Sequence, residues 1–324
     1  MTWRGDTGGA LITALLAVAL MSAVSLSLVE HMRAGLLRAG VLDDRLQAEA
    51  FLDGAAAFSE AMLIRARGPA GQAATPDGPW DGRARVFDVD GGHLAGAILD
   101  RHNCLNVNAL YSGADQRDAD EAAAERFRVL FSALDLPLAD SESLIAQAAD
   151  WIDPDAGVRP GGTEDYMTRD GQRRRAANQP LTELAELRAL PVMTPALFAR
   201  IEPFVCVLPT PDQPPLNLNT LRSEQSVLIT AMTDGAISPA AAAGVVFRRP
   251  SSGFSNMDQV WRDPAFAALE EEARPATRVA LRSDWFELHL DVRLDRAALS
   301  RRQLIRIETG GAVARFPAIQ GAVL

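Results

Sequence analysis

The chain has 324 residues, with 32 Lys+Arg against 42 Asp+Glu, and therefore a formal net charge of −10 at pH 7. All of its basic residues are arginines, because the sequence contains no lysine. This acidic balance argues against general binding to nucleic acid or to an anionic membrane surface, since phosphate contacts need clustered positive charge. With 48% hydrophobic and 23% charged residues, the composition is that of a folded chain long enough for about two domains.

Histidine and cysteine are too sparse for the common metal and nucleophile motifs. The four histidines are scattered, and the sequence contains neither HExxH nor GxSxG. Its two cysteines, Cys104 and Cys206, form no CxxC pair, which excludes a cysteine-rich zinc module. Metallohydrolase and serine-hydrolase functions are therefore disfavoured.

An uncharged apolar stretch occupies residues 9–29 and ends at Glu30. At about 1.5 Å per residue, a helix of this length spans roughly 30 Å, the thickness of a bilayer's hydrocarbon core. Three interpretations are open: a secretory signal, a simple anchor, or the membrane half of a longer helix. A signal is the weakest of them, because its small-residue cleavage site, residues 17–19, would lie in the middle of the stretch.

The helical pattern continues beyond this stretch. No proline occurs before Pro69, and apolar residues recur every three to four positions between Leu36 and Leu63. That spacing is typical of an amphipathic helix whose apolar face packs on a globular body. We therefore predict one helix over about residues 10–66, with one half in lipid and the other half on a domain.

This arrangement resembles that of type IV pilin-like proteins. The segment GGALIT at residues 8–13 is similar to a prepilin peptidase site, with cleavage after Gly8 and Gly9 as the new first residue; cleavage after Gly9 is the alternative. Most pilins carry Glu at the fifth mature position, where this chain has Thr13. A carboxylate there would neutralise the N-terminal amine of the neighbouring subunit, because an unpaired charge in lipid is costly. The departure implies a subunit at the tip of a filament.

Seven motifs further along the chain, taken in order, are similar to those of the type II secretion minor pseudopilin K family. They are DRHNCLNVNAL (100–110), DWIDPD (150–155), GGTEDY (161–166), NQPL (178–181), ELR (186–188), LNLNT (216–220) and RSDWF (282–286). The resemblance implies an α+β protein with a type IV pilin-like fold, in which a long N-terminal helix packs on an antiparallel sheet and a large all-α domain is inserted.

The residue patterns agree with that order of elements. Residues 84–99 alternate around a Gly-Gly pair and predict a β-hairpin, residues 115–264 are helical in pattern, and residues 278–294 and 303–309 alternate again. The sequence LNVNAL at 105–110 recurs as LNLNTL at 216–221, which we interpret as two helix starts capped by asparagine. The expected divisions are a leader (1–8), a transmembrane half-helix (9–30), the pilin helix and first strands (31–110), the inserted helical domain (111–272) and the C-terminal strands (273–324).

The only concentrated chemistry is an acidic loop. Five carboxylates lie within sixteen residues: Asp150, Asp153, Asp155, Glu164 and Asp165. Only Arg159 lies among them, so the cluster repels itself unless it binds a cation. Calcium accepts about six to eight oxygen ligands in flexible geometry, and the family resemblance implies calcium binding in the inserted domain. The loop is not an EF-hand, because Val158 stands where the loop needs glycine. The alternative is a solvated acidic loop; carboxylate-pair catalysis is disfavoured because all the carboxylates lie in one local loop.

Cys104 and Cys206 form a disulfide if the domain faces the periplasm, since that compartment is oxidising. Two buried free thiols are the alternative.

The resemblance implies a minor pseudopilin, not an enzyme, at the tip of the type II secretion pseudopilus, which takes part in assembly initiation and in protein export across the outer membrane. Its implied partners are the minor pseudopilins I and J and the prepilin peptidase. It would cross the inner membrane once, with a methylated mature N-terminus and the C-terminal domain in the periplasm, and bind no nucleic acid.

The rival interpretation is a membrane-anchored periplasmic calcium-dependent enzyme or adhesin that uses the same loop. A helix-hairpin-helix nucleic-acid module in residues 180–245 is a weaker one, because the net charge is −10 and lysine is absent.

Overall fold

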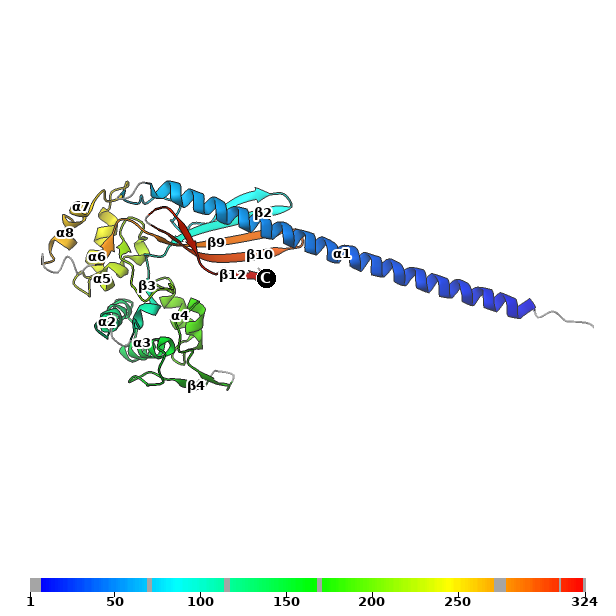
Figure 1. Ribbon diagram of the computed structural model, residues 1–324, viewed down its shortest axis with the longest axis horizontal. Coiled ribbons are helices and arrows are strands. Elements are labelled where there is room, and N and C mark those ends of the chain that lie inside the picture. The colour runs from blue at the N-terminus through cyan, green and yellow to red at the C-terminus, as the bar shows by residue number, and fades with distance from the viewer. Residues whose placement is uncertain are drawn as a thin grey trace, which may run out of the picture.

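A computed structural model describes residues 7–68, 72–113, 117–167, 171–270, 278–308 and 310–322. Its longest element is the helix α1, Thr7–Arg67, of 61 residues, which projects far beyond the body (Figure 1). The predicted single helix is therefore confirmed. Most of the predicted leader lies outside the described residues, and residues 7 and 8 begin α1.

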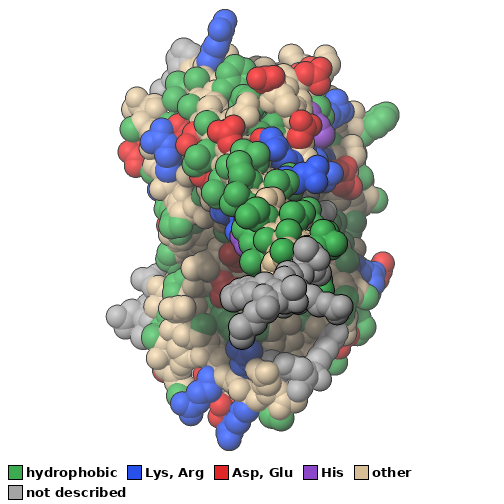
Figure 2. Space-filling view, turned by 90° about the vertical axis from the view of Figure 1, so that its right-hand side faces the viewer, with side chains coloured by type: hydrophobic (Ala, Val, Ile, Leu, Met, Phe, Trp, Pro, Cys, Tyr) green, Lys and Arg blue, Asp and Glu red, His purple; other side chains and the backbone are tan. Residues whose placement is uncertain are grey.

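The two halves of α1 have different surroundings. In its N-terminal half the apolar side chains are exposed, as at Leu16 with 64% of its surface accessible. An 18-residue window there has a mean hydropathy of 2.3 with none of it buried, so this half is long and apolar enough to cross a membrane. Seen along α1 from its N-terminal end, hydrophobic side chains gather on the projecting helix while charged side chains spread over the body (Figure 2). From Asp44 onward, side chains such as Ala48, Leu52 and Leu63 are buried against the body.

The C-terminal half of α1 packs on a six-stranded sheet of order β1-β2-β9-β10-β11, with β12 also paired to β10. The strand pairings are all antiparallel. The strands are β1 (Arg85–Val89), β2 (Gly92–Asp100), β9 (Trp285–Leu294), β10 (Ala298–Ile307), β11 (Val313–Arg315) and β12 (Ile319–Ala322). The predicted hairpin is confirmed as β1–β2, and its turn requires glycine at position 91, where φ is 78°.

The strand predicted over residues 278–294 is in fact two strands. Val279–Ala280 forms β8, which pairs with β7 (Leu216–Asn217) in the helical part, and the chain enters the sheet only at Trp285. The break has a physical cause: Leu281 is buried in the core of the helical part, and Ser283 hydrogen-bonds to buried polar groups beside it.

A helical part with its own hydrophobic core lies between β2 and β9 in the chain. Its helices are α2 (Arg117–Ala133), α3 (Leu138–Ile152), α4 (Pro195–Ile201), α5 (Val227–Met232), α6 (Pro239–Arg248), α7 (Met257–Trp261) and α8 (Pro264–Ala267), with the 3₁₀ helices η1 (Val107–Leu110), η2 (Leu184–Ala189) and η3 (Ser223–Gln225). The short strands β3 (Leu105–Asn106) and β6 (Val205–Cys206) pair in parallel, as do β7 (Leu216–Asn217) and β8; β4 (Asp165–Met167) and β5 (Arg173–Arg175) form an antiparallel hairpin.

The helical core begins a few residues before the predicted boundary at residue 111. Leu105, Val107 and Leu110 pack among the helices, although we assigned residues 31–110 to the pilin part. The repeated asparagine motif explains this early start. Asn106 and Asn217 each accept a hydrogen bond from the backbone N–H two residues later, at 3.3 and 3.0 Å, so both copies turn the chain from a short parallel strand into the helical part. Only the first copy caps a helix, η1.

Cys104 and Cys206 form a disulfide with an S–S distance of 2.02 Å and a sequence separation of 102 residues. Both cysteines are buried beside Leu208 and Trp285. The bridge therefore fastens the first segment of the helical part at the seam where this part meets the sheet.

Removing this bridge should cost several kcal/mol of folding free energy. Closure of a loop of about 100 residues stabilises by roughly 4–5 kcal/mol in the chain-entropy description. We expect the double variant Cys104→Ser/Cys206→Ser to lose stability of this order in denaturant unfolding of the full chain in detergent. The reduced wild type should match the variant. A loss below about 1 kcal/mol would contradict a structural role for the bridge.

Candidate metal centre in the acidic loop

The acidic loop begins at the C-terminal end of α3. Asp150 lies in the last turn and is 0% exposed, and Asp153, 1% exposed, caps the helix with its backbone N–H on the Ala149 carbonyl. The last turn of α3 contains no basic residue. A helix C-terminus carries partial negative charge, so both carboxylates lie where the helix itself disfavours them. They need compensating positive charge.

Arg159 supplies part of that charge. Its Nη1 donates to Asp150 Oδ1 at 2.7 Å and also to Asp153 Oδ2. Its backbone N–H is 3.4 and 3.3 Å from the two Asp150 oxygens. One guanidinium thus holds two buried carboxylates together.

Two further carboxylate oxygens are buried without a partner. Asp153 Oδ1 and Glu164 Oε1 find no hydrogen-bond donor in the described part of the chain. Burial raises the pKa of Glu164, and the negative charges of Asp153 and Asp150 raise it further. Burial likewise raises the pKa of Asp153 even though Arg159 opposes the effect. A buried acceptor without a donor is unfavourable, so this place suits a cation.

Asn178 closes the loop from the other side. Its Nδ2 donates to the Asp155 carbonyl at 2.5 Å, and its side chain opposes the rise in the pKa of Glu164. Its φ of 51° is in the left-handed region, which asparagine tolerates better than most residues. The sequence prediction did not include Asn178 in the site, although this residue begins the family motif NQPL at 178–181.

The last two predicted ligands differ in placement. Asp155 Oδ1 accepts a hydrogen bond from the Gly157 N–H at 2.7 Å, so the residue lies in the loop itself. Asp165 lies on β4, where its oxygens are 3.2 and 3.3 Å from Arg173 and Arg175 on β5. The structure therefore joins Asp150 and Asp153 through Arg159, places Asp155 and Glu164 where their charges act on this pair or on each other, and pairs Asp165 with arginines.

The residues fit a hard cation by charge and donor type. One guanidinium pairs with two buried carboxylates, the charges of Asp153, Asp150 and Asp155 act on Glu164, and two buried oxygens lack donors in the described part of the chain. Gly162 leaves room beside Asp150, because a Cβ there would lie 2.0 Å from Oδ2. Among the described residues, no three His, Cys, Asp or Glu side chains are already arranged as metal ligands, so Arg159 and the carboxylates would have to rearrange to admit an ion.

The long helix, the antiparallel sheet and the inserted helical part define a pilin-like protein, and comparisons with known proteins narrow the class. Two family profiles described as type II secretion system protein K match residues 103–210 and 216–282. The type II secretion system protein K of Pectobacterium carotovorum subsp. carotovorum is 30% identical over 306 residues, covering 93% of this chain and 92% of the relative. That of Dickeya chrysanthemi is 27% identical over 338 residues, covering 93% of each.

A solved structure agrees. A chain in the crystal structure of the GspK-GspI-GspJ complex from the type 2 secretion system of enterotoxigenic Escherichia coli matches with a TM-score of 0.74 and 26% identity, over 88% of this chain and 100% of that chain. The chain belongs to the type II secretion system protein K family. The resemblance found in the sequence motifs is confirmed, and with it a minor pseudopilin role in type II secretion.

The raised pKa values of Asp153 and Glu164 predict how the metal-free protein responds to pH. A carboxyl group whose pKa is higher in the folded than in the unfolded state stabilises the fold below its unfolded pKa, and this stability is lost as pH rises through the folded pKa. The contribution of these two groups to the stability of the metal-free protein should therefore fall as pH rises from about 4 toward neutrality. Glu164→Gln should reduce this loss and stabilise the metal-free protein at pH 7 by roughly 0.5 kcal/mol, since Glu164 is only half-buried.

Denaturant unfolding with a chelator at pH 4.5 and pH 7 tests this prediction. Asp140→Asn, at the exposed first turn of α3, is the matched control and should leave the pH dependence unchanged. If Glu164→Gln destabilised the metal-free protein at pH 7, the carboxylate would not be repelled in this loop.

Proposed function

We propose that the chain is a structural subunit, not an enzyme, at the tip of the type II secretion pseudopilus, where it joins the minor pseudopilins I and J. The supporting observation is the similarity in fold to a chain crystallised in a GspK-GspI-GspJ complex, which extends over 88% of this chain. In this role it takes part in starting pseudopilus assembly and in export of proteins across the outer membrane.

The N-terminal part of α1 supports a tip position. Thr13 replaces the carboxylate of ordinary pilins, and its hydroxyl donates to the Gly9 and Ala10 carbonyls of its own helix, at 3.2 and 3.0 Å. Such a residue offers no negative charge to the amine of a neighbouring subunit. The helix can pack beside others without accepting a subunit above it.

Two further features support a location in the inner membrane and the periplasm. The exposed apolar half of α1 suits a single crossing of the inner membrane. The Cys104–Cys206 disulfide suits an oxidising compartment, so the proposal places the C-terminal body in the periplasm. The prepilin peptidase would cut after Gly8, and the new N-terminus at Gly9 would be methylated.

The mature N-terminus is the first test of this proposal. Mass spectrometry of protein from membranes should show loss of residues 1–8 and a methylated Gly9 only when the prepilin peptidase is present. Gly8→Val should block processing, whereas Gly35→Ala, in the open part of the same helix, should not. An intact Met1 in cells that contain the peptidase would overturn the assignment to the pilin class, whereas cleavage after Gly9 would only move the site by one residue.

We also propose that the acidic loop binds calcium, as the donor set suggests. Asp150, Asp153, Asp155 and Glu164 would supply the carboxylate oxygens, and Asp165 is a fifth ligand if it leaves its arginine partners. A bound calcium ion supplies the positive charge that one guanidinium cannot. The result would be a loop locked to the end of α3.

Calcium should stabilise the full chain in detergent. A ligand at about one hundred times its dissociation constant adds about 2.7 kcal/mol to the free energy of unfolding. We expect Asp153→Asn and Glu164→Gln to abolish the shift seen on calcium addition, measured by thermal unfolding and by isothermal titration calorimetry. Asp140→Asn should retain it.

Asp165→Asn tests whether the fifth carboxylate takes part. Magnesium should stabilise less than calcium, because it requires a tighter octahedral geometry. An equal calcium shift in the wild type and in Asp153→Asn would exclude this loop as the site.

A further inference from the structure

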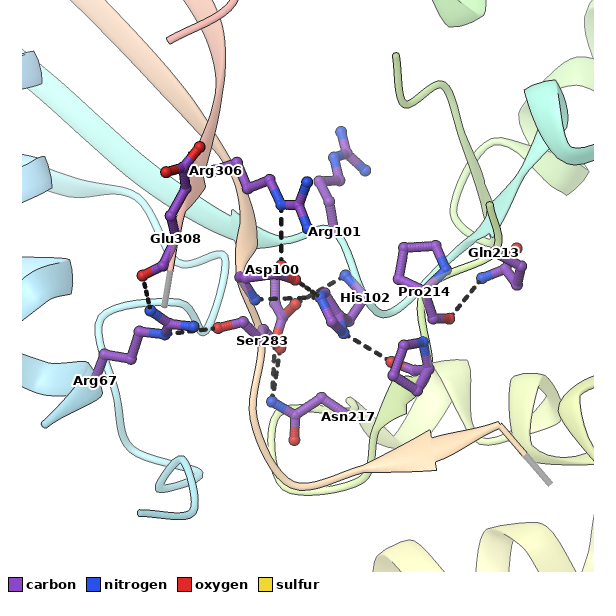
Figure 3. A network of polar contacts seen from close by, with 12 residues as sticks. Arg67, Asp100, Arg101, His102, Gln213, Pro214, Asn217, Ser283, Arg306 and Glu308 are labelled. Carbon is purple, nitrogen blue, oxygen red and sulfur yellow. Dashed lines mark hydrogen bonds and ion pairs between the residues drawn. The ribbon is translucent and has the colours of Figure 1, made fainter. Parts of the chain in front are cut away.

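A buried histidine lies at the seam between the sheet and the helical part. His102 follows β2 and is 4% exposed. Its Nδ1 is 2.7 Å from the Pro215 carbonyl, which precedes β7, and its Nε2 is 2.5 Å from Asp284 Oδ1, which precedes β9. Three chain segments that are distant in sequence therefore meet on one imidazole ring (Figure 3).

The partners of the ring fix which protons it can carry. A carbonyl oxygen only accepts, so Nδ1 keeps its proton in both states of the ring. Nε2 has two neighbours of opposite kind, because the Asp284 backbone N–H also points to it at 3.2 Å. With its proton, Nε2 donates to the Asp284 carboxylate; without it, Nε2 accepts from the Asp284 N–H. The site offers a hydrogen bond to either state.

The charges around His102 act differently on the protonated and the neutral ring. Asp284 bridges His102 and Arg306, whose Nε is 3.1 Å from Oδ2. Burial alone would raise the pKa of Asp284, but the hydrogen bonds and charges of His102 and Arg306 hold it below its usual value, so the group stays ionised. Arg306 is the like charge that opposes an imidazolium.

The other carboxylate nearby is already occupied. Asp100 accepts the His102 backbone N–H at 2.9 Å and the hydroxyls of Thr220 and Ser283, each at 2.5 Å. Asp284 is therefore the carboxylate that pairs with the positive charge of the protonated ring.

We propose that His102 is a proton-operated latch that fastens the helical part to the pilin-like sheet. With both ring nitrogens protonated, the ring ties the Pro215 segment to the Asp284 carboxylate. When the proton on Nε2 leaves to solvent, Nε2 accepts from the Asp284 backbone N–H, and the carboxylate keeps its ion pair with Arg306. The seam loosens as pH rises. This latch needs neither the tip position nor calcium.

Nitrogen-15 NMR of histidine-labelled full chain in detergent micelles tests the latch directly. At low pH both nitrogens of His102 should appear protonated, and above the transition only Nδ1 should, with Nε2 unprotonated. The Asp284 amide resonance should shift at the same midpoint. A ring that carries the same number of protons from pH 5 to pH 9 would overturn the proposal, whatever the variants do.

Two variants extend the test to the seam. Asp284→Asn removes the charge that favours the imidazolium and should lower the proton affinity of the ring at least about tenfold. The thermal unfolding midpoint of the wild type should fall over the pH range in which His102 loses its Nε2 proton. His102→Gln should remove this fall. His93→Gln, at an exposed position of β2, is the matched control and should retain the fall in thermal midpoint. His289, which pairs with Glu287 at 2.9 Å, is distinguished from His102 by its own resonance. Parallel pH profiles of wild type and His102→Gln would contradict the latch.

Discussion

A buried carboxylate at the end of β2 fixes how the two parts of this protein meet. Asp100 is 7% exposed and sits in the middle of the seam. It accepts hydrogen bonds from the His102 N–H, the Ser283 and Thr220 hydroxyls and the Asn217 amide, at 2.9, 2.5, 2.5 and 3.3 Å. A buried charge is tolerated only with such full hydrogen bonding. Because the donors come from three separate segments, the helical part has one placement on the sheet that satisfies Asp100.

The long helix is held on the same body by the ion pairs Asp53–Arg301 and Glu60–Arg315, and by a further arginine at each end of its packed half. At its C-terminal end, Arg67 donates to the Ser283 and Glu308 carbonyls at 3.2 and 3.0 Å, while Arg282 donates to the Gly68 carbonyl at 3.4 Å. Burial and the neighbouring Arg282 charge lower the pKa of Arg67. Its hydrogen bonds to the carbonyls at the seam offset this unfavourable environment. At the other end Arg296 pairs with Asp44 at 3.0 Å and crosses α1 over Gly40, where a Cβ would lie 2.1 Å from its guanidinium. Residues 7–43 of α1 therefore project from a rigid base (Figure 1).

Much of this architecture could be predicted from local patterns. The C-terminal half of the long helix and the helical segment were readable because apolar residues recur at a helical spacing. The membrane half of the helix was readable from its unbroken apolar run, and the hairpin at 84–99 from alternation around a Gly-Gly turn. The break before Trp285 was missed, although three consecutive polar residues at 282–284 interrupt the alternation there. The groups that hold this segment, such as Asn217, come from distant parts of the chain, and the sequence does not show them. The same limit applied to the acidic loop. Spacing singled out its five carboxylates, but only the folded chain shows that Asn178 joins the loop and that Asp165 turns to its arginines.

The two charged centres of the molecule act on different parts of it. The acidic loop grows from α3, whose residues from Leu144 to Ile152 are buried in the helical core, and it ends near β4, away from the sheet (Figure 1). A cation there would tighten the helical part internally, since the groups it neutralises are fixed to that core. The seam at Asp100 and His102 instead sets the position of the helical part on the sheet. No residue of the acidic loop is among the hydrogen-bond partners found for Asp100 or His102 in the described ranges. The effects on stability of ion binding at the loop and of proton binding at His102 should therefore add.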